Sequence, residues 1–422
     1  MINTDYFKNK KVIIAGFARS GLACANLLYD LGADVSVTDN KDCDSTRSNL
    51  VKLKSNKIKI ELGQHSEGFV KNKDLLVISP GVTNSALPIV WAEQLNIPVI
   101  SEIELAWMLC PAVIIAVTGS SGKTTVATLI GKIIEASGKK AFVCGNIGNP
   151  FSDEVHKMAP DDFVSLEISS FQLERIRNFK PKISVILNFS KNHLDRYKDM
   201  REYLDAKKRI FMNQGDSDFL VLNGCDPILK KLSDETKAKV LFFLESQDLN
   251  PNQAAVVTVG SILGIEKNIC LKVFSEFKGL QHRFEYVTEI NNIKFINDSK
   301  ATLVESTIWA IKNISSPVIL IAGGKDKGVD YKGILDIAAK KVKEVILIGE
   351  AKEKIKKEFN GFLSLDEAST LEEAVNKAYL KASPGDSVLL SPMCSSFDMF
   401  SNYEERGDCF KKAVLNLAKA QS

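Results

Sequence analysis

The stretch Val113-Ile-Ile-Ala-Val-Thr-Gly-Ser-Ser-Gly-Lys-Thr-Thr125 joins an apolar, β-branched run to a short glycine-rich turn and a Lys-Thr-Thr sequence. From Val126 onward, apolar residues recur at 126, 129, 130, 133 and 134, and this spacing predicts a helix. A strand, a glycine-rich loop, Lys-Thr and a helix in this order are typical of a phosphate-binding loop. In such a loop, backbone N–H groups and the positive end of the helix hold phosphate oxygens.

The loop predicts a binding site for ATP. Lys123 is expected to reach the terminal phosphates, and the Thr124 hydroxyl is expected to bind Mg²⁺. The strict motif has a glycine about six residues before the lysine, where this chain has Val117. A tight turn without a ligand is the alternative, although a turn explains neither Lys123 nor the paired threonines. The predicted ATP-binding residues are Gly119, Ser120, Ser121, Gly122, Lys123, Thr124 and Thr125.

Length and composition limit the class of protein. The 422 residues exceed what one hydrophobic core usually supports, so two or three domains are expected. A formal net charge of +3 without a long basic block argues against a nucleic-acid partner. No apolar run approaches the roughly 18 residues of a membrane span, and a strand begins too early to leave room for a signal peptide. The 8 cysteines lack metal-type spacing and indicate reduced thiols in a cytoplasmic protein. Without heptads, a monomer is expected.

Residues 1 to 96 alternate short strands with helical segments, which predicts an open, largely parallel α/β domain. Between the first strand and the first helix lies Gly16-Phe-Ala-Arg-Ser-Gly21, which resembles a dinucleotide-binding turn except that Ala18 replaces its second glycine. Asp39 ends the second strand and is placed to bind a ribose or a base edge. The alternative is a tight turn with no ligand.

Asn146, Glu167 and His193 each lie at or just past the end of a predicted strand in the central section, residues 97–306. Because parallel strands end at one edge of their sheet, these residues are expected to converge with the phosphate-binding loop. Glu167 lies in an otherwise apolar strand, where an unpaired carboxylate is unfavourable and a Mg²⁺ ion would relieve the burial. The alternative is an exposed glutamate on an edge strand.

Four residues carry less specific signals. A lone histidine such as His193 is more often structural, but its place beside the phosphate-binding loop favours a function. Lys207 lies in a basic helical stretch, and from residue chemistry alone it is expected to be a solvated charge. The last section, 307–422, is predicted to form a third α/β unit, and two of its strand-end loops carry Lys327 and Ser396, which are able to bind a carboxylate.

Several motifs in order resemble the Mur ligase family of peptidoglycan-building enzymes over nearly the whole chain. The motifs are Thr118-Gly-Ser-Ser-Gly-Lys-Thr-Thr125, Gly145-Asn-Ile-Gly148, Leu166-Glu-Ile-Ser-Ser-Phe-Gln-Leu173, residues 188–195, Gly279-Leu-Gln-His-Arg-Phe-Glu285 and Asn297-Asp-Ser-Lys-Ala-Thr302. Within the family, two further stretches are most similar to the members that add D-glutamate. These are Gly323-Gly-Lys-Asp-Lys-Gly328 and Leu390-Ser-Pro-Met-Cys-Ser-Ser-Phe-Asp398.

The resemblance implies an ATP-dependent amide ligase of three α/β domains. It implies a Rossmann-like domain at 1–96, a central P-loop ATPase-like domain with a mostly parallel sheet at 97–306, and a Rossmann-like domain at 307–422. It also implies that the enzyme joins UDP-N-acetylmuramoyl-L-alanine to D-glutamate through an acyl phosphate, in cytoplasmic peptidoglycan precursor synthesis.

The same resemblance implies roles for single residues. Lys123, His193 and Lys207 would be catalytic, and Lys207 would be carbamylated. Two Mg²⁺ ions would be held by Thr124, Glu167, His193 and Lys207. The UDP-sugar substrate would be bound by Gly16, Ser20, Gly21, Asp39 and Asn146, and D-glutamate by Lys327, Ser396, Phe397 and Tyr403. Ser169 would also bind substrate. The chain departs from the family pattern at Arg19, Lys191, Asn192 and Leu303.

Other classes of protein stay open at this point. Another Mur-family ligase or a folate polyglutamate ligase would share the central motifs. An NAD-dependent dehydrogenase would rest on Gly16–Gly21 and Asp39 alone. A nucleotide-switch protein would rest on Lys123 and Thr124 alone.

Overall fold

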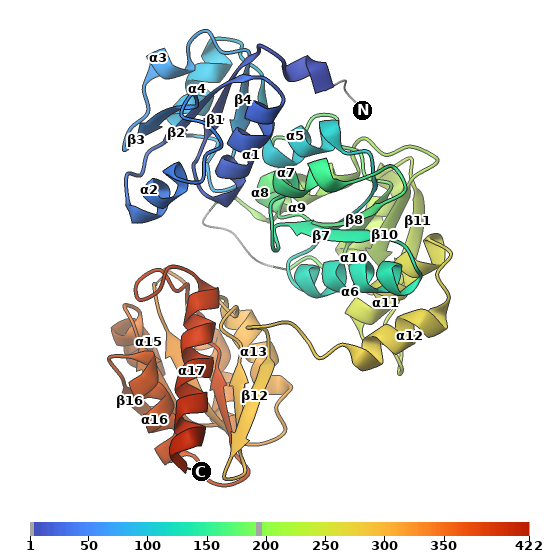
Figure 1. Ribbon diagram of the computed structural model, residues 1–422. Coiled ribbons are helices and arrows are strands. Elements are labelled where there is room, and N and C mark those ends of the chain that lie inside the picture. Colours follow the sequence, from blue (N-terminus) through green and yellow to red (C-terminus); the bar gives the residue numbers. More distant parts are fainter. Residues whose placement is uncertain (1–3, 191–195, 327, 422) are drawn as a thin grey trace. The chain divides into compact units, whose positions relative to one another are not determined.

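The computed structural model describes residues 4–190, 196–326 and 328–421, and its strands form three sheets (Figure 1). The chain divides into two compact units, Met1–Phe277 with the first two sheets and Lys278–Ser422 with the third. The predicted class of three α/β domains with mostly parallel sheets is confirmed. Short 3-10 helices also occur, at Thr4–Phe7, Val155–Lys157, Arg209–Phe211, Lys231–Glu235 and Lys332–Ile334.

The first sheet is entirely parallel, with strand order β3-β2-β1-β4-β5. This order, in which the chain returns past β1 to add β4, is that of a Rossmann-like half. Its strands are β1 Lys11–Ala15, β2 Asp34–Asp39, β3 Lys59–Leu62, β4 Leu75–Ile78 and β5 Val99–Ser101. Its helices are α1 Arg19–Asp30, α2 Asp44–Leu50, α3 Glu67–Val70, α4 Leu87–Gln94 and α5 Glu102–Leu109.

The second sheet is also parallel, with strand order β11-β10-β9-β6-β8-β7. β6 is an interior strand, so the loop that follows it opens at the middle of the sheet edge. The strands are β6 Val113–Thr118, β7 Ala141–Gly145, β8 Phe163–Glu167, β9 Ile183–Ile186, β10 Phe219–Asn223 and β11 Lys239–Phe243. The helices are α6 Lys123–Ala136, α7 Phe151–Glu154, α8 Ser170–Leu173, α9 Met200–Lys208, α10 Pro227–Lys230, α11 Pro251–Ile262 and α12 Lys267–Glu276.

The first two sheets share one hydrophobic core. A single cluster of buried side chains includes Val12 of β1 and Leu28 of α1 as well as Ala116 of β6 and Leu166 of β8. The other face of the second sheet has a core of its own, in which α6 and α11 pack on the strands and α12 packs on these two helices. Burial of apolar surface therefore joins the first two sheets into one compact unit.

The third sheet is mixed, with strand order β12-β13-β17-β14-β15-β16. β12 and β13 pair antiparallel through a turn in which Asn291 and Asn292 both have positive φ, the geometry of a tight hairpin. The strands are β12 Glu285–Ile290, β13 Ile293–Asn297, β14 Val318–Gly323, β15 Val342–Ile348, β16 Leu365–Glu367 and β17 Ser387–Leu390. The helices are α13 Val304–Lys312, α14 Leu335–Lys341, α15 Lys352–Phe359, α16 Leu371–Lys381 and α17 Tyr403–Gln421.

The β12–β13 hairpin bears on the predicted domain limits. It precedes residue 307, where the last section was expected to begin, yet β13 pairs in parallel with β17 of the third sheet. The compact units likewise divide at Phe277 and Lys278. The limits at 96 and 306 stay predictions, and the sheet pairing favours a second limit near residue 278.

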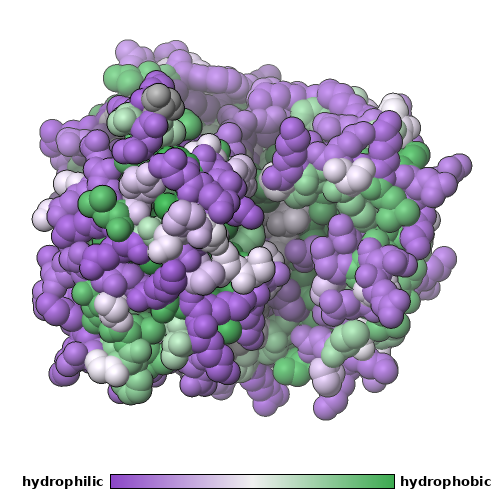
Figure 2. Space-filling view, turned by 90° about the horizontal axis from the view of Figure 1, so that it is seen from below, coloured by the Kyte–Doolittle hydropathy of each residue, from purple (hydrophilic) through white to green (hydrophobic). Residues whose placement is uncertain are grey.

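The surface face shown in Figure 2 is mostly hydrophilic, and its hydrophobic residues lie in small groups. Among the described helices, none is long and apolar enough to cross a membrane. All 8 cysteines are free thiols, and Cys24, Cys144, Cys270 and Cys394 are buried.

Candidate active site

The phosphate-binding loop lies between β6 and α6, as the sequence predicts. Gly119 and Gly122 have φ of 155° and 78°, backbone conformations that residues with a Cβ rarely adopt. A Cβ on Gly122 would also lie 2.5 Å from the Asn252 side chain. Gly122 is the residue before the first turn of α6, so the helix N-terminus opens directly onto the loop. The loop therefore has the backbone shape and the helix dipole that a phosphate site requires.

The loop is held by the segment that follows β9. Asn188 accepts a hydrogen bond from Ser121 N at 2.8 Å and donates one to Ser121 O at 3.2 Å. Ser120 Oγ donates to Ser190 O at 3.2 Å and accepts from Ser190 N at 3.0 Å. Thr124 is buried and Thr125 is half-buried in the first turn of α6. The hydrogen bonds of Asn188 and Ser190 hold Ser120 and Ser121 of the loop in place without a bound nucleotide.

The side-chain Nζ atoms of two lysines donate hydrogen bonds to one carbonyl oxygen in this loop. Lys123 Nζ donates to Gly119 O at 3.0 Å, and Lys207 Nζ donates to the same oxygen at 2.9 Å. Lys207 is 1% exposed, so the expectation of a solvated charge is wrong. Burial holds the pKa of Lys207 well below its usual range, and the Lys123 charge lowers it further.

Glu167 ends β8 beside the phosphate-binding loop. It pairs in register with Val117 of β6 on one side and Gly145 of β7 on the other, so the alternative of an exposed edge-strand glutamate is wrong. Its side chain is 1% exposed, and Oε1 accepts a hydrogen bond from Asn146 Nδ2 at 2.8 Å. Within the described residues, Oε2 has no hydrogen-bond partner. Thr118 Oγ1 of the adjacent strand is likewise buried without a partner in that part of the chain.

Other predicted residues of the first unit have structural bonds. Ser169 caps α8, since its Oγ accepts from Gln172 N at 3.3 Å. Asp39 accepts hydrogen bonds from Phe17 N at 2.6 Å and from Lys41 N, so it fixes the turn between β1 and α1. In that turn Gly16 has a φ of 92°, and a Cβ on Gly21 would lie 1.9 Å from Gly16 O. Ser20 is half-buried in the first turn of α1.

His193 and Lys327 lie outside the described residues. Arg196, just after the first of these, donates to Glu174 at 2.9 Å and to Pro80 O at 3.3 Å, and its guanidinium lies 4.1 Å from the centre of the Phe171 ring. The chain after residue 195 is thus fixed between the first sheet and the second.

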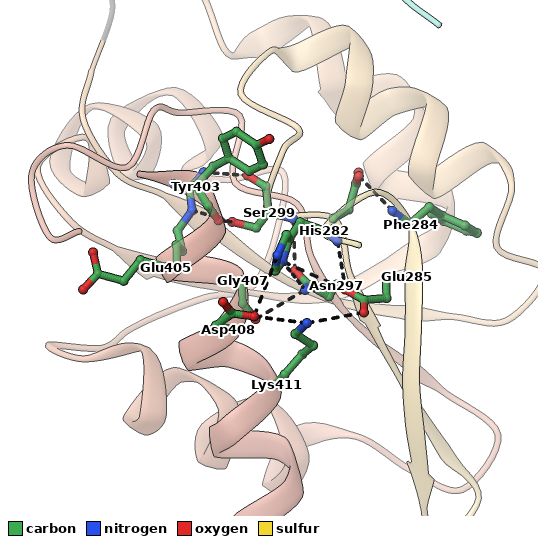
Figure 3. Close-up of polar contacts among 12 residues, drawn as sticks. His282, Phe284, Glu285, Asn297, Ser299, Tyr403, Glu405, Gly407, Asp408 and Lys411 are labelled. Carbon is green, nitrogen blue, oxygen red and sulfur yellow. Dashed lines mark hydrogen bonds and ion pairs between the residues drawn. The ribbon is translucent and has the colours of Figure 1, made fainter. Parts of the chain in front are cut away.

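Two of the predicted D-glutamate residues, Ser396 and Phe397, lie in the segment after β17 of the third sheet. Ser396 is buried, and Phe397 is exposed. Tyr403 begins α17, and its carbonyl accepts a hydrogen bond from Ser299 Oγ at 2.8 Å (Figure 3). Lys300 Nζ lies 4.7 Å from the centre of the Tyr403 ring.

A buried polar cluster next to Tyr403 carries residues whose roles sequence reasoning did not predict. Asn297 Nδ2 lies 3.1 Å from His282 Nδ1 and donates to Glu285 Oε2 at 2.9 Å (Figure 3). A Cβ on Gly407 would lie 2.1 Å from His282 Nδ1, so only glycine allows this approach. Burial lowers the pKa of His282, and the nearby Lys411 charge lowers it further. The motifs that hold His282 and Asn297 were the signal that could have located the cluster.

Three family models match successive parts of this chain. They are the Mur ligase MurD-like N-terminal domain over residues 10–101, the Mur ligase middle domain over 117–278 and the Mur ligase glutamate ligase domain over 282–394. This chain belongs to the Mur ligase family, and the predicted class of ATP-dependent amide ligase is confirmed. The dehydrogenase and nucleotide-switch alternatives do not fit this membership.

The curated relatives of this chain include ligases of one specificity. The UDP-N-acetylmuramoylalanine–D-glutamate ligase of Caldanaerobacter subterraneus subsp. tengcongensis is 39% identical over 98% of this chain and 99% of its own. The ligase of the same name from Geotalea uraniireducens is 40% identical over 97% of this chain and 98% of its own.

Solved structures of other Mur ligases have the same fold. The UDP-N-acetylmuramate–alanine ligase of Thermotoga maritima has a TM-score of 0.62 and 16% identity, covering 97% of this chain and 100% of its own. The MurF ligase of Thermotoga maritima, solved with ADP, has a TM-score of 0.60 and 15% identity, covering 99% and 98%. At these identities the likeness shows the fold alone.

Proposed function

We propose that this chain joins UDP-N-acetylmuramoyl-L-alanine to D-glutamate in cytoplasmic peptidoglycan precursor synthesis, using ATP. One observation chiefly supports the proposal. Lys123 and the buried Lys207 both donate hydrogen bonds to Gly119 O, in the loop next to Glu167, whose Oε2 has no hydrogen-bond partner among the described residues. Full-length similarity to relatives named as D-glutamate ligases supports the two substrates. We also propose that the chain acts as a monomer.

The reaction follows from the charges in the site. The alanyl carboxylate attacks the γ-phosphorus of ATP, the bond to the β,γ-bridging oxygen breaks, and ADP leaves. Lys123 neutralises charge on the transferred phosphoryl group, and the N-terminus of α6 holds the phosphates left on ADP. The D-glutamate amine then attacks the acyl carbon, loses a proton and expels phosphate, which leaves an amide. Lys123 and the loop thus lower the barrier by positioning and by electrostatics.

The residues of the first unit fit Mg²⁺, which is consistent with the family. The buried, unpartnered Oε2 of Glu167 is an oxygen ligand of the kind that Mg²⁺ prefers, and Thr124 lies in the first turn of α6. We propose two ions, held by Thr124, Glu167, His193 and Lys207. Bound there, Mg²⁺ would neutralise phosphate charge.

Lys207 fits this set only as a carbamate. Its burial and the adjacent Lys123 charge favour the neutral amine, which is the form that adds CO2. Addition of CO2 forms an N–C bond, releases a proton and converts the side chain to an anion next to Lys123. The modification would thereby replace a neutral amine with an anion that attracts the Lys123 ammonium.

The test is phosphate release with ATP, Mg²⁺ and UDP-N-acetylmuramoyl-L-alanine, against a panel of amino acids. D-glutamate should stimulate release, and L-glutamate, L-lysine and diaminopimelate should not. Release with L-lysine or diaminopimelate and none with D-glutamate would replace this function with that of another Mur-family ligase. A folate substrate in place of the UDP-sugar tests the folate polyglutamate alternative in the same assay.

A further inference from the structure

Arg406, in the first turns of α17, is a buried arginine that the proposed reaction does not use. It is 1% exposed, and burial lowers its pKa to about 10. A buried guanidinium is unfavourable unless hydrogen bonds compensate its desolvation, so its partners indicate what it does. Within the described residues, those partners all lie in loops at strand ends of the third sheet.

The guanidinium joins two loops that are far apart in the sequence. Nε donates to Ser299 Oγ at 3.0 Å, and Nη2 donates to Ser299 O at 2.7 Å. Nη2 also donates to Cys394 O at 3.1 Å. Ser299 follows β13 and Cys394 follows β17, so one planar side chain fixes the spacing of both loops.

A third loop packs against the same guanidinium. A Cβ on Gly324 would lie 3.1 Å from Arg406 Nη1 and 2.4 Å from Ser395 O, so the turn after β14 approaches both closely. Lys325 N donates to Ser395 O at 2.9 Å, which joins this turn to the loop after β17. The turn leads directly to Lys327, and the loop after β17 leads directly to Ser396.

The start of α17 is docked on the same loops. Ser299 Oγ, which accepts from Arg406, donates to Tyr403 O, and Figure 3 shows Ser299 beside this first turn of the helix. Asn297 Nδ2 donates at 3.3 Å to the carbonyl oxygen of Gly407, the residue that follows Arg406 in α17. Among the described residues, Arg406 therefore joins the loop that carries Ser396 to the first turn of α17, which carries Tyr403.

We infer that Arg406 is a positioning residue for the D-glutamate site, because its guanidinium sets the spacing of the turn at Gly324, the loop that carries Ser396 and the turn that begins with Tyr403. This inference rests on the proposed function. Since Arg406 is buried under these loops, it acts through them and does not touch the substrate.

The test compares Arg406→Lys and Arg406→Met with the wild type in steady-state kinetics. A lysine keeps the charge but cannot bridge two loops, so both variants should raise KM for D-glutamate by about tenfold, the effect of one lost charged hydrogen bond. KM for the UDP-sugar should change less than about twofold, since the proposed UDP-sugar residues belong to the other unit. Ser299→Ala, which removes the hydroxyl between Arg406 and Tyr403, should shift KM for D-glutamate in the same direction.

Lys411→Met is the matched control. Lys411 lies about one turn further along α17 and pairs with Asp408 at 3.1 Å and with Glu285 of β12 at 3.5 Å, so neither of these ion pairs involves the three loops that Arg406 joins. It should leave both KM values unchanged. If the Arg406 variants fail to fold, Ser299→Ala decides the question.

An unchanged KM for D-glutamate in the folded variants would refute the positioning role, as would an equal rise in both KM values. Absence of D-glutamate-dependent phosphate release in the wild type would instead refute the proposed function.

Discussion

Replacement of Lys207 by methionine should separate activity from stability. Methionine keeps most of the apolar stem in its buried position beside Tyr203, whose ring centre lies 4.5 Å from Lys207 Nζ. It removes the amine that the proposal requires as a carbamate. We therefore expect loss of turnover in a protein that folds normally.

The expected effect on stability is small. Two Nζ atoms that share Gly119 O at 2.9 and 3.0 Å lie within about 6 Å of each other. At an effective dielectric constant of about 20, two positive charges at that separation repel by roughly 3 kcal/mol, so the Lys207 amine is neutral or modified. Methionine then removes one hydrogen bond worth about 1 kcal/mol and buries no unpaired charge.

The effect on turnover is expected to be at least about a hundredfold, the usual scale for one group that stabilises transferred charge. Phosphate release gives the turnover, and thermal unfolding gives the stability. Lys208→Met is the control, because Lys208 is the next residue but pairs with Glu235 and Asp205 at the surface. With 13C-labelled bicarbonate, the wild type should show a carbamate resonance that Lys207→Met lacks. Near-normal turnover in Lys207→Met would refute the reasoning.

Three further changes test the account. Glu167→Gln keeps an oxygen that accepts from Asn146 but removes a buried carboxylate. Turnover with Mg²⁺ should therefore fall at least about a hundredfold, while the melting temperature should not fall. A lower melting temperature with normal turnover would contradict a metal role. Burial raises the pKa of Asp298 to about 7. The folded state thus binds this proton more tightly than the unfolded state, and stability of the C-terminal unit should fall as pH rises from about 4 to about 7 and then level off. Asp298→Asn should flatten that dependence in denaturant unfolding, and an unchanged profile would argue against it. Glu104 accepts hydrogen bonds from the backbone N–H groups of Arg177, Asn178 and Phe179 at 2.8–2.9 Å. Glu104→Gln should lower the unfolding free energy by about 2 kcal/mol, because its amide would face a donor, while leaving KM values unchanged.

The sequence predicted those features that depend on local periodicity and on strand order. The alternation of short apolar strands with helices predicts the parallel sheets. The change from an apolar run ending at Val117 to a glycine-rich turn before Lys123 predicts the phosphate-binding loop. The place of Glu167 at a sheet edge followed from the rule that parallel strands end together. Each strand, helix and loop that these predictions use is recognised from its own residues, without knowledge of a distant contact.

The features that sequence reasoning missed depend on contacts between distant segments. The resemblance to the Mur ligase family marked Lys207 as functional, but the charges of its helix suggest solvent and did not predict its burial; its Nζ donates to a carbonyl oxygen 88 residues away in the chain. Arg406 bonds to Ser299 across 107 residues, and no local spacing indicates that bond. The β12–β13 hairpin was grouped with the central section because its pairing with β17 cannot be read from its own residues.

The acyl-phosphate step is tested most directly by following a carboxylate oxygen of UDP-N-acetylmuramoyl-L-alanine through the reaction. In the proposed reaction, the carboxylate of UDP-N-acetylmuramoyl-L-alanine attacks the γ-phosphate of ATP before the D-glutamate amine attacks the acyl carbon. Substrate labelled with 18O in that carboxylate should therefore transfer one labelled oxygen to the released phosphate in each D-glutamate-dependent turnover. Unlabelled phosphate, with the label retained in the product or released in water, would contradict the account.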